Sequence, residues 1–260
     1  MDSSFVISLP SLVFVCFMVG LAGFVDAAAG GGGTISLPAY MFTGMPAHFA
    51  YGCNKFSGSC GTTLSVMRFW KNKALDLKAA LIAAAGSFIG SAIASEIVLM
   101  LDDQILKTML IFVIPCAALL ISFKHDFGEN NLSLSLTKRR TAVLACLIGF
   151  LIGGYDGLFG PGTGTFAIIA FSVLMKYDLK TASGNAKILN LASNYASLIT
   201  FATAGTIYYE IAVPAAVCGV IGNYFGSGVA LKKGAKFIRP MLVGVLFLLL
   251  GKMVYDILAR

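Results

Sequence analysis

Apolar stretches recur along the whole chain, and they restrict it to the folds that cross a membrane. Ten such segments can be drawn, and most have about 20 residues, enough for a helix to cross the roughly 30 Å hydrocarbon core of a bilayer. Composition agrees, because 58% of the 260 residues are hydrophobic and 12% are charged, against about 25% charged residues in an ordinary soluble domain. We therefore expect an all-α integral membrane protein with a single transmembrane domain over residues 1–260.

The ten segments form two sets of five, joined by a polar linker at about 125–137. The segments at 34–45 and 163–176 are short, and each follows a glycine-rich break, so we interpret them as half-helices or re-entrant pieces. The first set spans about 5–124 and the second about 138–258. The segments are 5–28, 34–45, 47–68, 77–101 and 104–123 in the first set, and 140–159, 163–176, 182–204, 208–231 and 237–258 in the second.

One short pattern occurs once in each set: an aspartate, a glycine-rich break, and then a lysine in Ala-x-Gly-x-x-Lys. Asp26 and Lys55 belong to the first copy, and Asp156 and Lys187 to the second. A duplicated chain with glycine breaks and one lysine per copy inside apolar sequence is typical of a secondary transporter. Because five is odd, the two halves are expected to be inverted repeats related by an axis in the membrane plane.

The basic residues predict which loops face the cytoplasm. Most of the 19 Lys and Arg residues follow odd-numbered segments, at 68–78, 124–140, 176–180 and 232–239. By the positive-inside rule these loops are cytoplasmic and both termini are not. The same distribution, in short loops between apolar segments, argues against nucleic-acid binding despite the formal charge of +7. We expect the first 30 residues to be a retained helix, since they lack the basic start of a signal peptide.

The two glycine-rich breaks cannot propagate a stable helix, so each is expected to open the N-terminal end of a short helix. Such an end carries unpaired N–H groups and partial positive charge. Two of them meeting near the midplane would form an anion site; the alternative is a kink or close helix packing. The residues expected to contribute are Gly31, Gly32, Gly33 and Thr34 in the first break and Gly160, Pro161, Gly162 and Thr163 in the second.

Lys55 and Lys187 are the matched cations of the two halves. Placing a lysine at membrane depth costs about 2.5–3.5 kcal/mol of insertion free energy, so such a residue is expected to have an ionic partner or a functional role. We interpret both as charge complements to an anionic substrate. The alternatives are an ion pair with Asp26 or Asp156, or a side chain that extends to the membrane interface.

Amide side chains beside these lysines add directional hydrogen-bond donors: Asn54, Asn185, Asn190 and Asn194. They would replace the hydration shell of an oxyanion or, alternatively, join helices by hydrogen bonds. The matched Asp26 and Asp156 are candidates for proton coupling, with a structural role as caps or lysine partners as the alternative. The repeated motifs Gly86-x-x-x-Gly90 and Gly222-x-x-x-Gly226 predict close helix packing and no substrate contact.

Several motifs resemble those of the sulfite exporter TauE/SafE family of membrane transporters, over nearly the whole chain. They are Asp-x-x-x-Gly-Gly-Gly-Gly-x-x-x-x-Pro at 26–38, Asn54-Lys55, Tyr155-Asp156-Gly157-x-Phe159-Gly160-Pro161, and Ala186-Lys187-x-x-Asn190. The resemblance implies a bacterial-type inner-membrane carrier of sulfur-containing anions such as sulfite, sulfonates or thiosulfate.

The favoured hypothesis is a secondary transporter that exports a small anion by alternating access. The alternatives are a passive anion channel, which the same helix ends would serve, and a membrane scaffold that transports nothing. The partners expected are the small anion and the lipid bilayer. We expect no enzyme activity, no cofactor and no metal, because the chain has two histidines, in or near loops, and six cysteines without a Cys-x-x-Cys motif.

Overall fold

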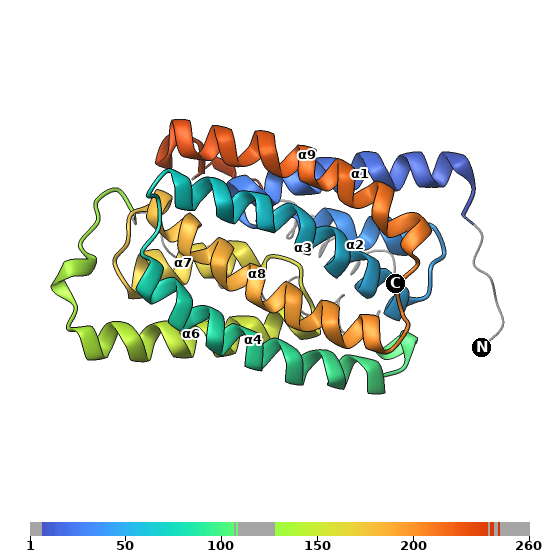
Figure 1. Ribbon diagram of the computed structural model, residues 1–260, viewed down its shortest axis with the longest axis horizontal. Coiled ribbons are helices and arrows are strands. Elements are labelled where there is room, and N and C mark those ends of the chain that lie inside the picture. Colours follow the sequence, from blue (N-terminus) through green and yellow to red (C-terminus); the bar gives the residue numbers. More distant parts are fainter. Residues whose placement is uncertain (1–6, 107, 109–127, 239, 242–243, 245–260) are drawn as a thin grey trace.

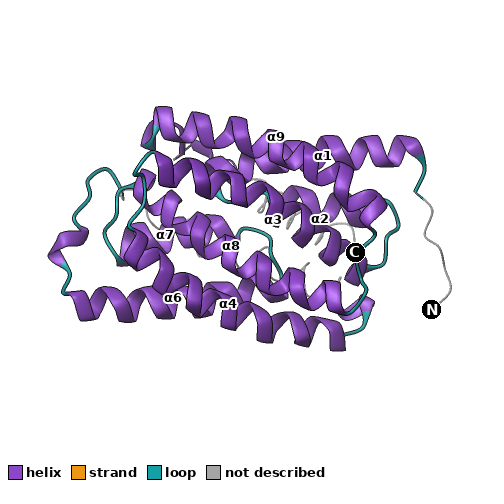
Figure 2. Ribbon diagram, in the orientation of Figure 1, coloured by secondary structure: helices purple, strands orange, loops and turns teal. Residues whose placement is uncertain are grey.

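The chain forms a bundle of helices (Figure 2), and every regular element among the described residues is helical, which confirms the all-α class. The computed structural model describes residues 7–106, 108, 128–238, 240–241 and 244. The predicted segments 104–123 and 237–258 lie for the most part outside them. The helices are α1 (Leu9–Ala29), α2 (Gly33–Phe42), α3 (Ala47–Lys71), α4 (Leu77–Met100), α6 (Lys138–Leu158), α7 (Thr163–Leu174), α8 (Leu179–Thr203) and α9 (Tyr209–Lys233), with a 3-10 turn at Ser133–Ser135.

Local capping explains where the long helices begin. The side chains of Ser8, Asp76, Thr137 and Asp178 each accept a hydrogen bond from a backbone N–H in the first turn of α1, α4, α6 and α8. These side chains satisfy donors that have no partner within the helix. Helix α1 ends at Gly30, whose left-handed backbone (φ +77°) closes the last turn and is a conformation that glycine adopts without strain.

Helices α2 and α7 are too short to cross a membrane. They contain 10 and 12 residues, which corresponds to about 15–18 Å at the rise of an α-helix. The hydrocarbon core is about 30 Å thick, so each helix reaches roughly half of it. Each follows a glycine-rich break, as the sequence predicts for half-helices.

The helices are arranged in layers (Figure 1). Helices α1 and α9 pack together on one side, α4 and α6 on the opposite side, and α3, α8 and the short helices lie between them. Among the described helices, α1, α4, α6 and α9 are long and apolar enough to span a membrane. Helices α3 and α8 are equally long, at 25 residues, but they carry more polar side chains, many of them buried, such as Ser57, Ser65, Ser193 and Ser197.

Glycines allow the outer helices to approach closely. A Cβ atom at Gly222 or Gly226 would collide with the backbone of α1, and one at Gly90 would collide with the backbone of α6. Small residues four apart are used in this way between membrane helices. The predicted packing role of the two repeated glycine motifs is therefore confirmed.

Apart from the two glycine-rich breaks, the described loops gather at two opposite ends of the bundle (Figure 1). At one end, the loops around 72–76, 128–137 and 175–178 bond to one another: Tyr177 donates to Asp76 Oδ2 (2.7 Å), and the Leu132 N–H donates to the Lys176 carbonyl (2.9 Å). At the other end, the N–H of Ala47 donates to the Asp103 carboxylate (3.0 Å). The basic loops at 68–78 and 176–180 and the described part of the linker therefore share the first end, and the C-terminal end of α9 lies there too (Figure 1).

Candidate functional site

The two glycine-rich breaks meet inside the bundle. The N–H of Thr165 donates to the carbonyl of Gly30 (3.2 Å), and the Thr165 hydroxyl donates to that of Ala29 (2.8 Å). A Cβ atom at Gly30 would overlap the backbone of Gly164. Glycine is thus required at this position both by its positive φ and by the close approach of the second break.

The short helices begin without side-chain caps at Gly32 and Gly162. The N–H groups of Thr34, Ile35, Thr163 and Thr165 donate to backbone carbonyls, so within the described residues the first-turn N–H groups without an acceptor are those of Gly33 and Gly164. The hydroxyls of Thr34 and Thr163 are used within the breaks, where each donates to the carbonyl three residues earlier (2.7 Å). Backbone donors, rather than these threonine hydroxyls, are therefore the groups that the breaks can offer to an anion.

Each lysine forms an ion pair with the aspartate of the other half. Lys55 Nζ lies 2.6 Å from Asp156 Oδ2, and Lys187 Nζ lies 2.8 Å from Asp26 Oδ2. Both lysines are buried, with exposed fractions of 1% and 0%. Of the interpretations left open by the sequence, the ion pair is the one that the structure contains. Ser193 also donates to Asp156 Oδ2 (2.6 Å).

The lysines also complete the ends of the interrupted helices. Lys55 Nζ donates to the backbone carbonyl of Asp156 (2.8 Å), and Lys187 Nζ donates to that of Asp26. These carbonyls belong to the last turns of α6 and α1, where the helix dipole places partial negative charge. Each ammonium group is therefore held by a carboxylate and a helix C-terminus together.

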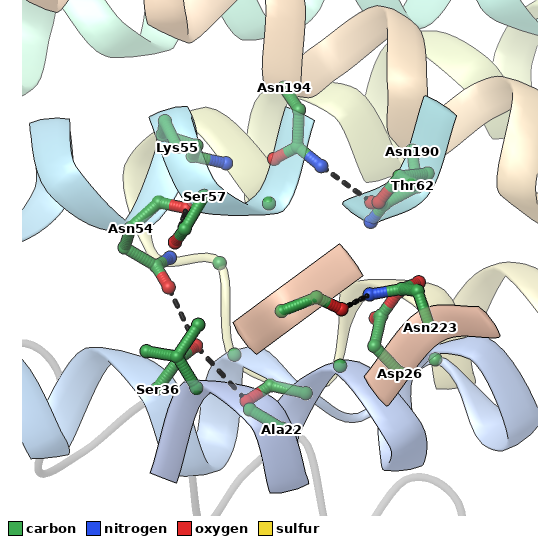
Figure 3. A pocket seen from close by; sticks show the side chains of 18 of the residues that line it. Ala22, Asp26, Ser36, Asn54, Lys55, Ser57, Thr62, Asn190, Asn194 and Asn223 are labelled. Carbon is green, nitrogen blue, oxygen red and sulfur yellow. Dashed lines mark hydrogen bonds between the residues drawn. The ribbon is translucent and has the colours of Figure 1, made fainter. Parts of the chain in front are cut away.

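A cavity of about 60 Å³ lies between the halves, beside the first break. Helices α1, α2, α3, α6, α8 and α9 all contribute to its wall (Figure 3). Of the site residues predicted from the sequence, nine line it: Asp26, Gly32, Gly33, Asn54, Lys55, Asp156, Gly160, Asn190 and Asn194.

The other predicted residues lie outside this cavity: Gly31, Thr34, Pro161, Gly162, Thr163, Asn185 and Lys187. Pro161 accepts a hydrogen bond from the Tyr155 hydroxyl (2.7 Å), and Asn185 accepts one from the N–H of Asp76 (2.8 Å). Asn185 thus joins α8 to the loop before α4. The N-termini of α2 and α7 do not border the cavity equally, because the second break, before α7, contributes only Gly160 to the wall.

Sequence reasoning missed four polar residues of the cavity wall: Ser36, Ser57, Thr62 and Asn223. Asn223 directly follows Gly222, in a motif that predicted packing alone. The signal that could have found it is asymmetry, because the matched position in the first half, after Gly86, is Ser87. A polar amide in only one copy of a packing motif indicates a role beyond packing.

The polar side chains of the wall form short hydrogen-bond chains (Figure 3). Asn194 Nδ2 donates to Asn190 Oδ1 (2.7 Å), and the Ser36 hydroxyl donates to Asn54 Oδ1 (2.6 Å). Ser65 donates to Asn223 Oδ1 (2.8 Å). The Oδ1 atoms of Asn190, Asn54 and Asn223 thereby accept hydrogen bonds, and Asn223 Nδ2 donates to the Gly219 carbonyl (3.0 Å). Among the described residues, no acceptor is found for the Nδ2 groups of Asn54 and Asn190, which lie on the cavity wall. Such an arrangement suits a small anion rather than a cation.

Comparison with known proteins identifies the family of the chain. The profile of the family described as Sulfite exporter TauE/SafE matches residues 15–253. The chain is 34% identical to a "Probable membrane transporter protein" of Haemophilus influenzae, over 94% of this chain and 95% of that protein. It is 33% identical to "Probable membrane transporter protein YfcA" of Escherichia coli K12, over 98% and 94%. No solved structure matches the chain with significance.

The family match covers most of the chain, and the relatives match over nearly their full length. Together with the apolar helices, these matches establish a multi-pass membrane protein. The chain belongs to the sulfite exporter TauE/SafE family of membrane transporters.

Proposed function

We propose that this chain is a secondary transporter that exports a small sulfur-containing anion, of the sulfite, sulfonate or thiosulfate class, by alternating access between its two halves. The observation that carries the proposal is the cavity beside the first glycine break, whose wall comes from both halves. The family's description as a sulfite exporter supports the substrate class and the direction.

Matched contacts support an inverted repeat. Helix α1 packs on α9 as α6 packs on α4, and α3 packs on α9 as α8 packs on α4. A Cβ atom at Gly52 would overlap the carbonyl of Thr206, and one at Gly184 would overlap that of Ala74. The two ion pairs follow the same pattern, because each joins a lysine of one half to an aspartate of the other. A pseudo-two-fold axis in the membrane plane would relate all of these pairs.

The anion is proposed to bind at the start of α2, where Gly32, Gly33, Asn54, Asn190 and Asn194 converge and Lys55 borders the cavity. In an alternating-access cycle two inverted halves exchange conformations. Lys187, Asn185 and the remaining residues of the two breaks would then approach the anion in the opposite-facing state. Asp26 and Asp156 are the proposed sites of proton coupling.

A liposome assay tests the proposed function. Purified protein would be reconstituted, and the flux of sulfite, thiosulfate and a small sulfonate would be measured with and without substrate on the opposite side. A carrier saturates and shows counterflow, whereas a channel follows the voltage and shows no counterflow. Absence of flux for all three anions would favour the scaffold, and counterflow only for an unrelated anion would contradict the substrate class.

A further inference from the structure

Unused hydrogen-bond donors face the central cavity (Figure 3). The Oδ1 atoms of Asn190 and Asn54 accept hydrogen bonds from Asn194 and Ser36, and within the described residues their Nδ2 groups have no partner. Thr62 makes no side-chain hydrogen bond there either. Asn190 and Thr62 are 6% and 2% exposed. Because these donors lie on the cavity wall and have no acceptor among the described residues, a ligand in the cavity would have to supply acceptor atoms to them.

The charged groups around the same cavity cancel one another. Lys55 pairs with Asp156 at 2.6 Å, and Lys187 pairs with Asp26 at 2.8 Å. Three of these four residues border the cavity, and Lys187 stands directly behind Asp26. The cluster therefore has no net charge when all four groups are ionised. Only neutral donors and the partial positive charge of the α2 N-terminus attract an anion.

We infer that the cavity selects a singly charged oxyanion, such as hydrogensulfite or a monosulfonate, over a dianion of similar size. This inference rests on the proposed anion transport and adds the charge state of the substrate. The cost of moving an ion out of water grows with the square of its charge, and burial makes that cost large. A site without net positive charge compensates one negative charge far better than two.

The cavity volume agrees with a small ligand. About 60 Å³ holds only a few water-sized groups, since each needs about 10–15 Å³. A sulfur atom with three oxygens and one small substituent is of this size. The wall carries amide groups such as Asn54 and Asn190 together with the apolar side chains of Val19 and Ala22.

Thermal unfolding of the purified full-length protein in detergent tests the inference. Methanesulfonate, a permanent monoanion, and sulfate, a dianion, would be titrated, and sulfite would be titrated one pH unit below and one above its second pKa. Methanesulfonate should raise the melting temperature equally at both pH values, and sulfate should bind at least tenfold more weakly. The apparent affinity for total sulfite should fall about tenfold at the higher pH, following the fraction of monoanion.

A charge variant provides the sharper test. Asp156→Asn retains the shape of the side chain and an acceptor for Ser193, but it leaves Lys55 without a counter-charge. We expect its affinity for sulfate, relative to methanesulfonate, to rise at least tenfold. Asp26→Asn is the equivalent variant in the other pair. Asp178→Asn is the control, because this residue caps α8 in a loop and asparagine is also a good cap.

The outcomes separate the two proposals. If sulfate stabilises the parent as well as methanesulfonate does, or if neither charge variant changes the ratio, selection by charge is wrong while an anion site remains. If no anion stabilises the parent, the cavity is not an anion site, and the proposed function loses its main support as well. The comparison of anions on the parent protein stands even where a variant fails to fold.

Discussion

Two buried lysines each link one half of this protein to the other. Lys55 and Lys187 are almost completely buried, and each finds its carboxylate and a helix C-terminus on the other half of the chain. A buried ion pair is weak as a source of stability, but removing one partner leaves a charge without compensation. The lysines are therefore best understood as the residues that fix how the two interrupted helices lie against the opposite half.

Replacing Lys55 by Met leaves the buried carboxylate of Asp156 without its cationic partner. We expect Lys55→Met to lower the free energy of unfolding by about 3–5 kcal/mol, and the double variant Lys55→Met, Asp156→Asn to recover most of that loss. Lys78→Met, at an exposed position of α4, should change it by no more than about 0.5 kcal/mol. Chemical unfolding in detergent measures all three. A single variant as stable as the parent, with lower flux, would instead assign Lys55 to the substrate.

The two aspartates are the candidates for coupling transport to protons. Asp26→Asn and Asp156→Asn remove the titratable group while keeping a hydrogen-bond acceptor for the paired lysine. We expect at least one of them to abolish the response of flux to an imposed pH gradient, because a carboxylate at membrane depth is an expected proton carrier. Flux in liposomes with and without the gradient is the measurement. An unchanged pH response in both variants means that the acids are structural.

At the scale of secondary-structure elements, the glycines of the two breaks allow the backbone after α1 to contact the backbone at the start of α7. Gly30 and Gly44 both have positive φ, of +77° and +83°, but only Gly30 packs against the other break. A Cβ atom at Gly44 would meet nothing within 4 Å. Comparing an alanine substitution at Gly44 with one at Gly30 therefore separates two contributions to the loss of stability. Both substitutions strain the backbone, but only the one at Gly30 disturbs the contact between the breaks.

We expect Gly44→Ala to cost about 1–2 kcal/mol, the penalty of a left-handed backbone for an ordinary residue. Gly30→Ala adds a collision with the backbone of Gly164 that no side-chain rotation relieves, so it should cost about 1–3 kcal/mol more, as overpacking of a tight core does. Unfolding midpoints of the two variants give the comparison. Equal losses would show that the breaks are not in firm contact.

At the scale of the whole molecule, the chain has two chemically different ends. The basic loops at 68–78 and 176–180 lie at one end, and the acidic Asp102 and Asp103 lie at the other. We propose that the basic end faces the cytoplasm, following the positive-inside rule. This orientation also places the start of α1 on the non-cytoplasmic side.

Labelling of single cysteines in whole cells checks this orientation. In a chain with its native cysteines replaced, Asn72→Cys and Gly234→Cys should be protected from an impermeant thiol reagent. Ala204→Cys, an exposed position at the opposite end, should react and serves as the matched control. Strong labelling at 72 and 234 without labelling at 204 would reverse the topology.

Local signals in the sequence determined most of the fold. The predicted segments 47–68, 77–101 and 163–176 agree with α3, α4 and α7 to within a few residues. Such agreement is expected where apolar length, glycine breaks and capping residues such as Asp76 act within one or two helical turns. Close helix packing at the two repeated glycine motifs was also predictable, because it depends on side-chain size alone.

Tertiary structure alone decided the rest. The sequence could not choose whether Lys55 pairs with Asp156 or with Asp26, because both acids lie in apolar sequence and the choice depends on which half packs against α3. Nor could it show that the cavity lies beside the α2 break and not equally beside α7, or that Asn223 joins its wall. These features arise from contacts between helices distant in the chain, where buried charges and amides take the nearest partners that packing offers.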